Sequence, residues 1–364
     1  MRVLIASDKF KGSLGAAEVA EAIAAGIADV LPHAEITLLP IADGGEGTAE
    51  VICRAARGEW HECEVHDPLG RRVRARYCTI DGGATAVMEM SEASGLWRVP
   101  FEKRDPLIAS SFGTGEMLLD AARRGEVGKV IIGLGGSATN DGGFGMARAL
   151  GFRFFDADEQ ELRGSVADLT QLARIEAPLD LRLPEIIAAV DVRNPLLGDR
   201  GATRVFGPQK GATAADLEVL EAALTRLAAV TGGHDRDVPG AGAAGGLGFG
   251  LMRFCRASLR SGFEVVAEVT HLEDAVRAAD VVITGEGRLD AQTLEGKAPA
   301  GVAQFARKHG KRVYAIVGVA KDAPLMFDGV STLVDANTSA GEAMNDPVCL
   351  LRARAGELAS TFRR

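Results

Sequence analysis

The chain has 364 residues, of which 47% are hydrophobic and 25% are charged, and its formal net charge at pH 7 is −9. This composition is that of a globular protein, and the length suits two domains better than one. The acidic balance argues against a nucleic-acid-binding surface, so an anionic small molecule would need a local basic cluster.

The N-terminal end of the chain has the alternating strands and helices of a parallel α/β sheet. Residues 2–6 predict a short strand, and Ser13 is the expected N-cap of the helix that follows. "EITLLP" (35–40) predicts a second strand, and "GTAEVICRAARG" (47–58) predicts a second helix.

The C-terminal end repeats this alternation. Helices are predicted over 271–280, 299–310 and 345–364, and strands over 281–287, 312–318 and 331–336. Residues 60–90 instead alternate like antiparallel strands, and residues 105–260 mix helices, strands and glycine-rich loops. The patterns predict an α/β fold in which 1–60 and 261–364 form one doubly wound parallel sheet domain. Residues 61–260 form an inserted α/β domain with a mixed sheet.

The cysteines and the apolar runs limit where the protein works. The five cysteines are scattered and none are spaced as C-x-x-C, which argues against disulfides or a zinc site and favours a reducing cytosol. No stretch approaches 18 apolar residues without a charge, and the first apolar run soon meets polar residues. We therefore expect a cytoplasmic protein without a signal peptide or a membrane span.

Three loops that follow strands of the outer domain carry charged side chains. Ligands of doubly wound sheets bind beyond the carboxyl ends of the strands. "SDKFKGS" offers Asp8, Lys9 and Lys11, "ADGGEGT" offers Asp43 and Glu46, and "TGEGRLDAQTLEGKAP" offers Glu286, Arg288 and Asp290. Lysines before a helix suit an anion, and glycines let a ligand approach the backbone. The alternatives are solvated turns and acidic helix caps.

"GLGGSATNDGG" (133–143) lies between a predicted strand and a predicted helix, which is the setting of a phosphate-binding loop. Backbone N–H groups of such a loop, those of Gly135 and Gly136 among them, can wrap phosphates. Further hydroxyl and amide donors come from Ser137, Thr139 and Asn140. Asp141 could hold a magnesium ion. No G-K-[ST] follows, so this is not a Walker A loop, and a tightly turned helix start is the alternative.

Three further stretches of the inserted domain carry candidate groups. Asp191 follows the predicted strand "EIIAAV" and could act as a base, or form a magnesium pair with Asn194; the alternative is an Asx-turn. Lys210 in "VFGPQKGAT" could neutralise phosphate or simply point into water. "PGAGAAGG" (239–246) contains G-x-G-x-x-G, but a loop precedes it, which argues against a dinucleotide site.

Glycine loops, lysines and acids together are the set that phosphoryl transfer needs: a cradle, a cationic clamp, a metal site and a base. The motifs "DKFKGSL", "PIADGGEGT", "GLGGSATNDGGFGMARALG", "FGPQKGA", "DVPGAGAAGGLG" and "VITGEGRLDAQT" resemble the bacterial glycerate kinase family, in order and over nearly the whole chain. The resemblance implies a flavodoxin-like domain with a second α/β domain inserted. It also implies ATP-dependent phosphorylation of D-glycerate, generally to 2-phosphoglycerate. The chain departs from the family pattern at Lys9, where serine is usual.

We expect direct, magnesium-assisted transfer from ATP in a cleft between the two domains, with Asp191 as first and Asp290 as second candidate for the base. The catalytic candidates are Asp191, Lys11, Lys210 and Asp290; the substrate-binding candidates are Asp8, Lys9, Asp43, Glu46 and Arg288; the phosphate-binding candidates are Gly135, Gly136, Ser137, Thr139 and Asn140; the metal candidates are Asp141 and Glu286. The alternatives are a kinase for another small hydroxy or sugar acid, and a non-catalytic regulator that binds a small acid. The sequence leaves open a monomer or a homodimer.

Overall fold

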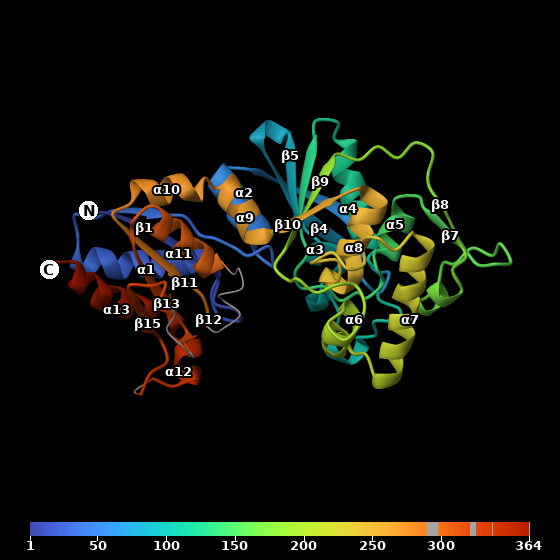
Figure 1. The fold of residues 1–364 in the computed structure, drawn as a ribbon. Coiled ribbons are helices and arrows are strands. Elements are labelled where there is room, and N and C mark those ends of the chain that lie inside the picture. Colours follow the sequence, from blue (N-terminus) through green and yellow to red (C-terminus); the bar gives the residue numbers. More distant parts are fainter. Residues whose placement is uncertain (290–297, 321–324, 337, 364) are drawn as a thin grey trace. The chain divides into compact units, whose positions relative to one another are not determined.

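The chain forms two compact units in a computed structural model that describes residues 1–289, 298–320, 325–336 and 338–363. Unit 1 consists of Met1–Asp43, Glu50–Ala56 and Phe263–Arg364, and unit 2 consists of Gly44–Ala49 and Arg57–Gly262. Each unit has a central sheet with helices packed against it (Figure 1). The predicted α/β fold class is therefore confirmed.

Unit 1 contains a five-stranded parallel sheet in the order β15–β13–β11–β1–β2. The strands are β1 (Arg2–Ser7), β2 (Glu35–Leu38), β11 (Val281–Gly285), β13 (Arg312–Val317) and β15 (Gly329–Thr332). Counted along the chain, this is the flavodoxin-like order 2-1-3-4-5. The order of the strands reverses between β1 and β11, so the topological switch point lies at the carboxyl ends of these two strands.

Helices cover both faces of the sheet of unit 1. In Figure 1, α1 (Ala16–Val30) and α13 (Pro347–Ser360) lie side by side on one face, where Ile5 of β1 shares a core with Ile23 of α1. The other face packs against α9 (Gly262–Val269), α10 (Leu272–Ala278) and α11 (Ala298–Lys308). The remaining elements are α2 (Thr48–Ala56), α12 (Ala340–Asn345), and the short paired strands β12 (Arg288–Leu289) and β14 (Val319–Ala320).

The first helix begins two residues later than the predicted cap implies. Its N-cap is Gly15 rather than Ser13, and the backbone N–H of Gly15 donates to the Glu18 carboxylate at 2.9 Å. The Glu18 side chain thus makes one half of a capping box, which needs no hydroxyl at the cap position.

Unit 2 contains a six-stranded mixed sheet in the order β10–β9–β6–β5–β4–β3. The strands are β3 (Glu59–His66), β4 (Arg72–Ile80), β5 (Thr85–Glu89), β6 (Lys129–Gly133), β9 (Glu185–Val190) and β10 (Ser258–Ser261). The first three pair antiparallel, as the alternation of residues 60–90 predicts, and the last four pair parallel. The parallel strands β5, β6 and β9 are nearly continuous apolar runs because both faces of the sheet are covered.

The helices of unit 2 are α3 (Ser91–Ser94), α4 (Phe112–Arg123), α5 (Phe144–Ala149), α6 (Ala202–Phe206), α7 (Ala214–Val230) and α8 (Ala243–Cys255). A separate antiparallel pair joins β7 (Arg153–Phe155) and β8 (Arg174–Glu176). Side chains from the sheet and from these helices share one apolar core.

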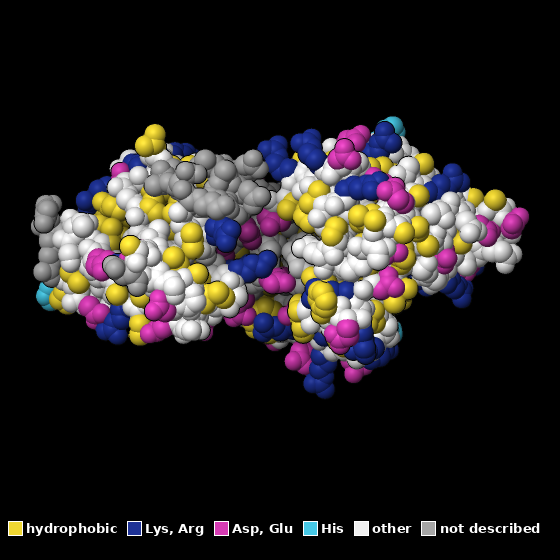
Figure 2. All heavy atoms as spheres, turned by 90° about the horizontal axis from the view of Figure 1, so that it is seen from below, with side chains coloured by type: hydrophobic (Ala, Val, Ile, Leu, Met, Phe, Trp, Pro, Cys, Tyr) yellow, Lys and Arg dark blue, Asp and Glu magenta, His cyan; other side chains and the backbone are white. Residues whose placement is uncertain are grey.

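Two features of the molecule agree with the composition of the chain, namely the mixture of charges on its surface and the length of its helices. Basic and acidic side chains are interspersed on the face of the molecule that Figure 2 shows. None of the helices in the described part of the chain combines the length and the apolar character that crossing a membrane requires.

Candidate active site

Acidic side chains gather at the switch point of unit 1. Asp8 directly follows β1 and Glu286 directly follows β11, and the N–H of Asp8 donates to the carbonyl oxygen of Gly285 at 2.8 Å. The side chains of Asp8 and Glu286 are nearly buried, with 7% and 8% of their surface exposed. Asp43 is half-buried, and its charge acts on Asp8. We call Asp8, Asp43 and Glu286 the acidic cluster.

The position of Asp8 in the acidic cluster raises the pKa of its carboxyl group from 3.8 to about 7. Burial is the largest cause, because it removes water from the charged form, and the charges of Asp43 and Glu286 act in the same direction. The ammonium group of Lys9 lowers the pKa, as does the backbone N–H of Lys9, which donates to Asp8 Oδ1 at 2.6 Å. A carboxyl group with a pKa near neutrality suits a general base.

The predicted basic residues of unit 1 differ in their surroundings. Lys9 is half-buried and acts on Asp8, whereas Lys11 is exposed in the turn before α1. Arg288 is exposed in the short strand β12, two residues after Glu286. Asp290, the second candidate for the base, lies outside the described residues. The structure thus brings Lys9 to the acidic cluster.

Two buried hydroxyl groups at the same edge of the sheet were not predicted from the sequence. Ser7 is the last residue of β1, and Thr284 is the penultimate residue of β11. Both side chains are fully buried, and neither side-chain oxygen has a hydrogen-bond partner among the described residues. A hydroxyl residue in one of the last two positions of an aliphatic strand is the signal that could have identified both.

The segment Gly44–Ala49 lies across the carboxyl ends of the parallel strands of unit 2. Its backbone N–H groups at Gly47 and Ala49 both donate to Glu89 Oε1, at the end of β5, at 2.9 Å. A Cβ atom at Gly133, at the end of β6, would lie 2.9 Å from the carbonyl oxygen of the segment's first residue. The segment therefore belongs to the sheet edge from which the loop 133–143 leaves.

The two acids of "ADGGEGT" consequently belong to different units, although the sequence analysis placed both in the outer domain. Asp43 is part of the acidic cluster, whereas Glu46 lies beside Gly136 in unit 2. The two residues are three positions apart, so their Cα atoms are separated by at most about 11 Å. The motif thus connects two groups of candidate residues through a very short stretch of backbone.

Close packing explains the glycines of the loop 133–143. A Cβ atom at Gly135 would lie 2.6 Å from the Cα atom of Gly45, and one at Gly136 would lie 2.1 Å from Glu46 Oε1. Gly136 also has a φ of +68°, which favours glycine. These positions need glycine for contact with the segment Gly44–Ala49, whether or not phosphate binds. The phosphate-binding role of Gly135 and Gly136 stays a prediction.

Lys210 is buried beneath this loop rather than pointing into solvent. It ends the short 3₁₀ helix η5 (Pro208–Lys210), and only 2% of its surface is exposed. Its ammonium group donates to Ser137 Oγ at 2.8 Å and to the carbonyl oxygen of Thr139 at 2.6 Å. Burial lowers the pKa of Lys210 to about 7, against a smaller opposing effect of the Asp141 charge. The structure therefore brings Lys210 and the predicted phosphate loop together.

Two polar groups of the same loop are buried without a full set of partners. Asn140 Nδ2 donates to Thr203 Oγ1 at 2.9 Å, but Asn140 Oδ1 and Thr139 Oγ1 have no hydrogen-bond partner among the described residues. Both side chains are fully buried. Buried polar atoms normally find partners, so these two atoms are candidate contacts for a bound ligand.

Asp141 has the structural role that the alternative for this loop, a tightly turned helix start, implies. Its Oδ2 atom accepts from the N–H and the hydroxyl of Ser111 at 2.9 and 2.7 Å and from the N–H of Gly145 at 3.0 Å, and its Oδ1 atom accepts from the N–H of Gly143 at 3.1 Å. Four donors therefore occupy a carboxylate that is 1% exposed. The carboxylate thus holds the start of α5, and the role of Asp141 as a metal ligand stays a prediction. Ser111 was not recognised, because it lies 30 residues away.

The loops that contain Asp191 and "PGAGAAGG" differ in exposure. Asp191 is exposed directly after β9, and its role as a base stays a prediction. The glycine-rich stretch 240–250 is buried, and a Cβ atom at Gly245 would lie 1.9 Å from the carbonyl oxygen of Thr139. Its glycines thus allow it to pack against the predicted phosphate loop.

The described residues contain no group of three or more His, Cys, Asp or Glu side chains that could hold a metal ion. Asp141 accepts four hydrogen bonds from the protein, and Glu286 shares its surroundings with Asp8 and Asp43. Glu286 as a metal ligand stays a prediction.

Comparison with known proteins identifies the family. A model of the Glycerate kinase family matches residues 3–363. The chain belongs to the glycerate kinase family. It is 46% identical to the glycerate kinase of Haemophilus influenzae over 336 residues, which are 90% of this chain and 89% of that protein. It is 46% identical to the glycerate 2-kinase of Escherichia coli K12 over 329 residues, 88% of this chain and 86% of that protein.

A solved structure supports the same assignment. The crystal structure of a Salmonella typhimurium LT2 protein described as a glycerate kinase 2 matches with a TM-score of 0.88 and 44% identity, and covers 100% of this chain and 98% of that one. Kinases of this family phosphorylate an alcohol group, so the expectation that this chain is a phosphotransferase is confirmed.

Proposed function

We propose that this enzyme transfers a phosphoryl group from ATP to D-glycerate and forms 2-phosphoglycerate. The names of the relatives support the acceptor, since those from Haemophilus influenzae and Bacillus subtilis are glycerate kinases and that from Escherichia coli is a glycerate 2-kinase. The geometric observation that carries the proposal is the acidic cluster at the switch point of unit 1, the place where flavodoxin-like sheets bind ligands.

In this proposal Asp8 accepts the proton of the reacting hydroxyl group, in place of Asp191. The support is its position directly beyond β1, its burial, and the neighbouring charges that bring its pKa near neutrality. A base with such a pKa is unprotonated often enough to accept a proton and basic enough to hold it. Lys9, Lys11 and Arg288 are the cations of unit 1 that we assign to the carboxylate of glycerate.

The phosphate groups of ATP are bound, in the same proposal, by the loop 133–143. The support is the buried ammonium group of Lys210 at 2.8 Å from Ser137, together with the unpartnered polar atoms of Thr139 and Asn140. A half-turn of the Asn140 amide would let the Thr203 hydroxyl donate to its oxygen and would free the NH₂ group for a phosphate. The reaction then needs groups of both units, because Asp8 and Lys210 belong to different ones.

Magnesium accompanies ATP in this proposal as the ion that the phosphates themselves hold. Mg²⁺ keeps several waters and is usually bound by one or two carboxylates plus substrate phosphates. When bound, it would neutralise charge on the transferring group. The proposed roles of Asp8 and Lys210 do not depend on a metal ion that is bound by protein side chains.

The decisive test is the identity of the product. Phosphorus NMR after incubation with ATP, magnesium and D-glycerate should show 2-phosphoglycerate, and ADP should appear in equal amount. Tartronate, lactate and erythronate serve as competing acceptors. Faster turnover of any of these would favour a kinase for another hydroxy acid. Glycerate binding without ADP release would favour a non-catalytic regulator.

A further inference from the structure

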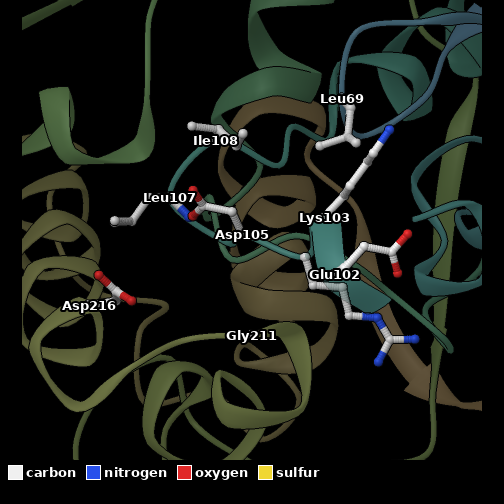
Figure 3. A pocket seen from close by; sticks show the side chains of 9 residues that line it. Leu69, Glu102, Lys103, Asp105, Leu107, Ile108, Gly211 and Asp216 are labelled. Carbon is white, nitrogen blue, oxygen red and sulfur yellow. The ribbon is translucent and has the colours of Figure 1, made fainter. Parts of the chain in front are cut away.

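Unit 2 contains a pocket of about 610 Å³, and none of the roles proposed above involves it (Figure 3). Its lining is formed by Leu69, Glu102, Lys103, Arg104, Asp105, Leu107, Ile108, Gly211 and Asp216. Pockets that bind small organic molecules have volumes of roughly 300–1,000 Å³, with apolar walls and a few polar groups. The volume of this pocket is far larger than that of a glycerate molecule.

One wall of the pocket is aliphatic and is held in place by turns. Leu69 lies in a turn in which its N–H donates to Asp67 Oδ1 at 2.9 Å, and the N–H of Leu107 donates to Asp105 Oδ1 at 2.9 Å. Ile108 follows with 55% of its surface exposed. Figure 3 shows Leu107 and Ile108 near one another, with Asp105 beside them. This wall offers contact to a flat or apolar group.

The charged side chains of the pocket differ in the hydrogen bonds and ion pairs that they form with the rest of the protein. Asp105 accepts from a backbone N–H, and Asp216 accepts from the N–H and the hydroxyl of Thr213 in the capping box of α7. Lys103 forms no ion pair with any of the described residues. Among the described residues, the Arg104 guanidinium donates one hydrogen bond, to the carbonyl oxygen of Gln209 at 3.4 Å, and lies 5.2 Å from the centroid of the Phe101 ring; its Nε atom is buried without a hydrogen-bond partner. The two cations thus remain available for an anion.

The pocket is joined through the backbone to the predicted phosphate loop. Gly211 lines it, and the preceding residue, Lys210, holds Ser137 through its ammonium group. Gly211 has a φ of +99°, and a Cβ atom there would lie 2.5 Å from the carbonyl oxygen of Arg104. Glycine therefore lets η5 and the residues around Arg104 meet at the pocket.

We infer that this pocket binds the nucleoside part of ATP, with the base against Leu69, Leu107 and Ile108 and the phosphate chain beginning at Lys103 and Arg104. The inference rests on the proposed function. Of the two substrates, only the nucleotide combines a large apolar face with several negative charges, and glycerate is polar throughout. Glu102 is the carboxylate suited to the ribose hydroxyl groups, as acidic residues are in other nucleotide sites.

The test uses the full chain and the non-hydrolysable analogue AMP-PNP with magnesium. Ile108→Glu places a negative charge on the exposed apolar wall, and Leu179→Glu is the matched control, because Leu179 is a fully exposed leucine elsewhere in unit 2. Calorimetry should show that Ile108→Glu weakens AMP-PNP binding by at least about tenfold and that the control changes it less than about twofold. The KM for ATP should rise in parallel while the KM for glycerate stays the same.

A labelling experiment locates the base independently of any substitution. Photolysis of the wild-type enzyme with 8-azido-ATP should label Leu69 or the stretch 102–108, as peptide mass spectrometry can establish. Labels confined to other segments would overturn the inference, as would an unchanged KM for ATP in Ile108→Glu. If the wild-type enzyme makes no phosphoglycerate from ATP and D-glycerate, the proposed function itself fails. Normal turnover with unaltered nucleotide binding in Ile108→Glu rejects the pocket alone.

Discussion

The ammonium nitrogen of Lys210 lies 2.8 Å from the hydroxyl oxygen of Ser137, and both side chains are buried in unit 2. The two hydrogen-bond acceptors of the ammonium group, this hydroxyl and the Thr139 carbonyl oxygen, are both neutral. A buried lysine without a bonded carboxylate is costly to charge. The charged form of Lys210 therefore lowers the stability of the folded protein. Ionisable groups that are buried at such a cost are typical of functional sites.

Stability should depend on pH through Lys210. Burial lowers the pKa of Lys210 from 10.5 to about 7. Between these values the unfolded chain binds a proton that the folded chain does not, so the free energy of unfolding should rise with pH, by at most about 1.4 kcal/mol per pH unit. Urea unfolding between pH 6 and 9 should show this rise in the wild type and its loss in Lys210→Met. Lys129→Met is the control, because the side chain of Lys129 is 42% exposed, and a Lys210→Met profile parallel to that of the wild type would contradict the prediction.

Replacing Asp8 with asparagine should abolish activity and stabilise the protein at alkaline pH. The folded-state pKa of about 7 lies above the ordinary 3.8, so the cost of charging Asp8 is absent near pH 4, grows up to pH 7 and stays constant above it. Asp8→Asn should therefore exceed the wild type in stability at pH 8, by at most about 4 kcal/mol, and equal it near pH 4. Thermal unfolding at both pH values measures this.

The control for Asp8 is Asp274→Asn, which alters a 69% exposed carboxylate of the same unit. It should leave both activity and the pH dependence of stability unchanged. An Asp8→Asn enzyme that turns over normally would remove Asp8 as the base and return Asp191 to that role.

Asp141→Asn should destabilise unit 2. The NH₂ group of an asparagine amide cannot accept a hydrogen bond, and it would face either the donors of Ser111 and Gly145 or the donor of Gly143. Each hydrogen bond to a charged group that is lost in this way costs about 1.5–3 kcal/mol. Urea unfolding should show a lower midpoint at every magnesium concentration. A variant of unchanged stability that needs more magnesium for activity would instead support the assignment of Asp141 as a metal ligand.

A Gly136→Ala substitution should couple to Glu46. The added Cβ atom would lie 2.1 Å from Glu46 Oε1, and a φ of +68° costs a residue other than glycine about 1–2 kcal/mol. In the Glu46→Ala background the backbone cost should remain and the collision should disappear. A double-mutant cycle of unfolding free energies measures the difference, and purely additive effects would argue against the contact.

Local patterns were sufficient for several of the strands and for the loops that follow them. Apolar runs ending in glycine or acid predict β1, β6, β9 and β11 together with the residues at their carboxyl ends, Asp8 and Glu286 included, because both depend on neighbouring positions alone. The repeat of the alternation at both ends of the chain likewise predicts a single outer sheet.

Contacts between distant segments could not be predicted in this way. The segment Gly44–Ala49 belongs to unit 2 because of Glu89, about 40 residues away. The hydrogen bond between Ser111 and Asp141 joins residues 30 positions apart, and the one between Lys210 and Ser137 joins residues 73 positions apart. The raised pKa of Asp8 depends on Asp43 and Glu286, which lie 35 and 278 positions farther along the chain.

The assignment of Gly44–Ala49 to unit 2 has a consequence for the order of events during synthesis. Among the described strands, β1 pairs with β2 and β11, and β11 begins at Val281, so the sheet of unit 1 cannot be completed until most of the chain has left the ribosome. All strands of the larger sheet of unit 2, by contrast, are available once Ser261 has emerged. Unit 2 can thus fold first, with the segment Gly44–Ala49 already packed on its sheet, before β11 is available to pair with β1.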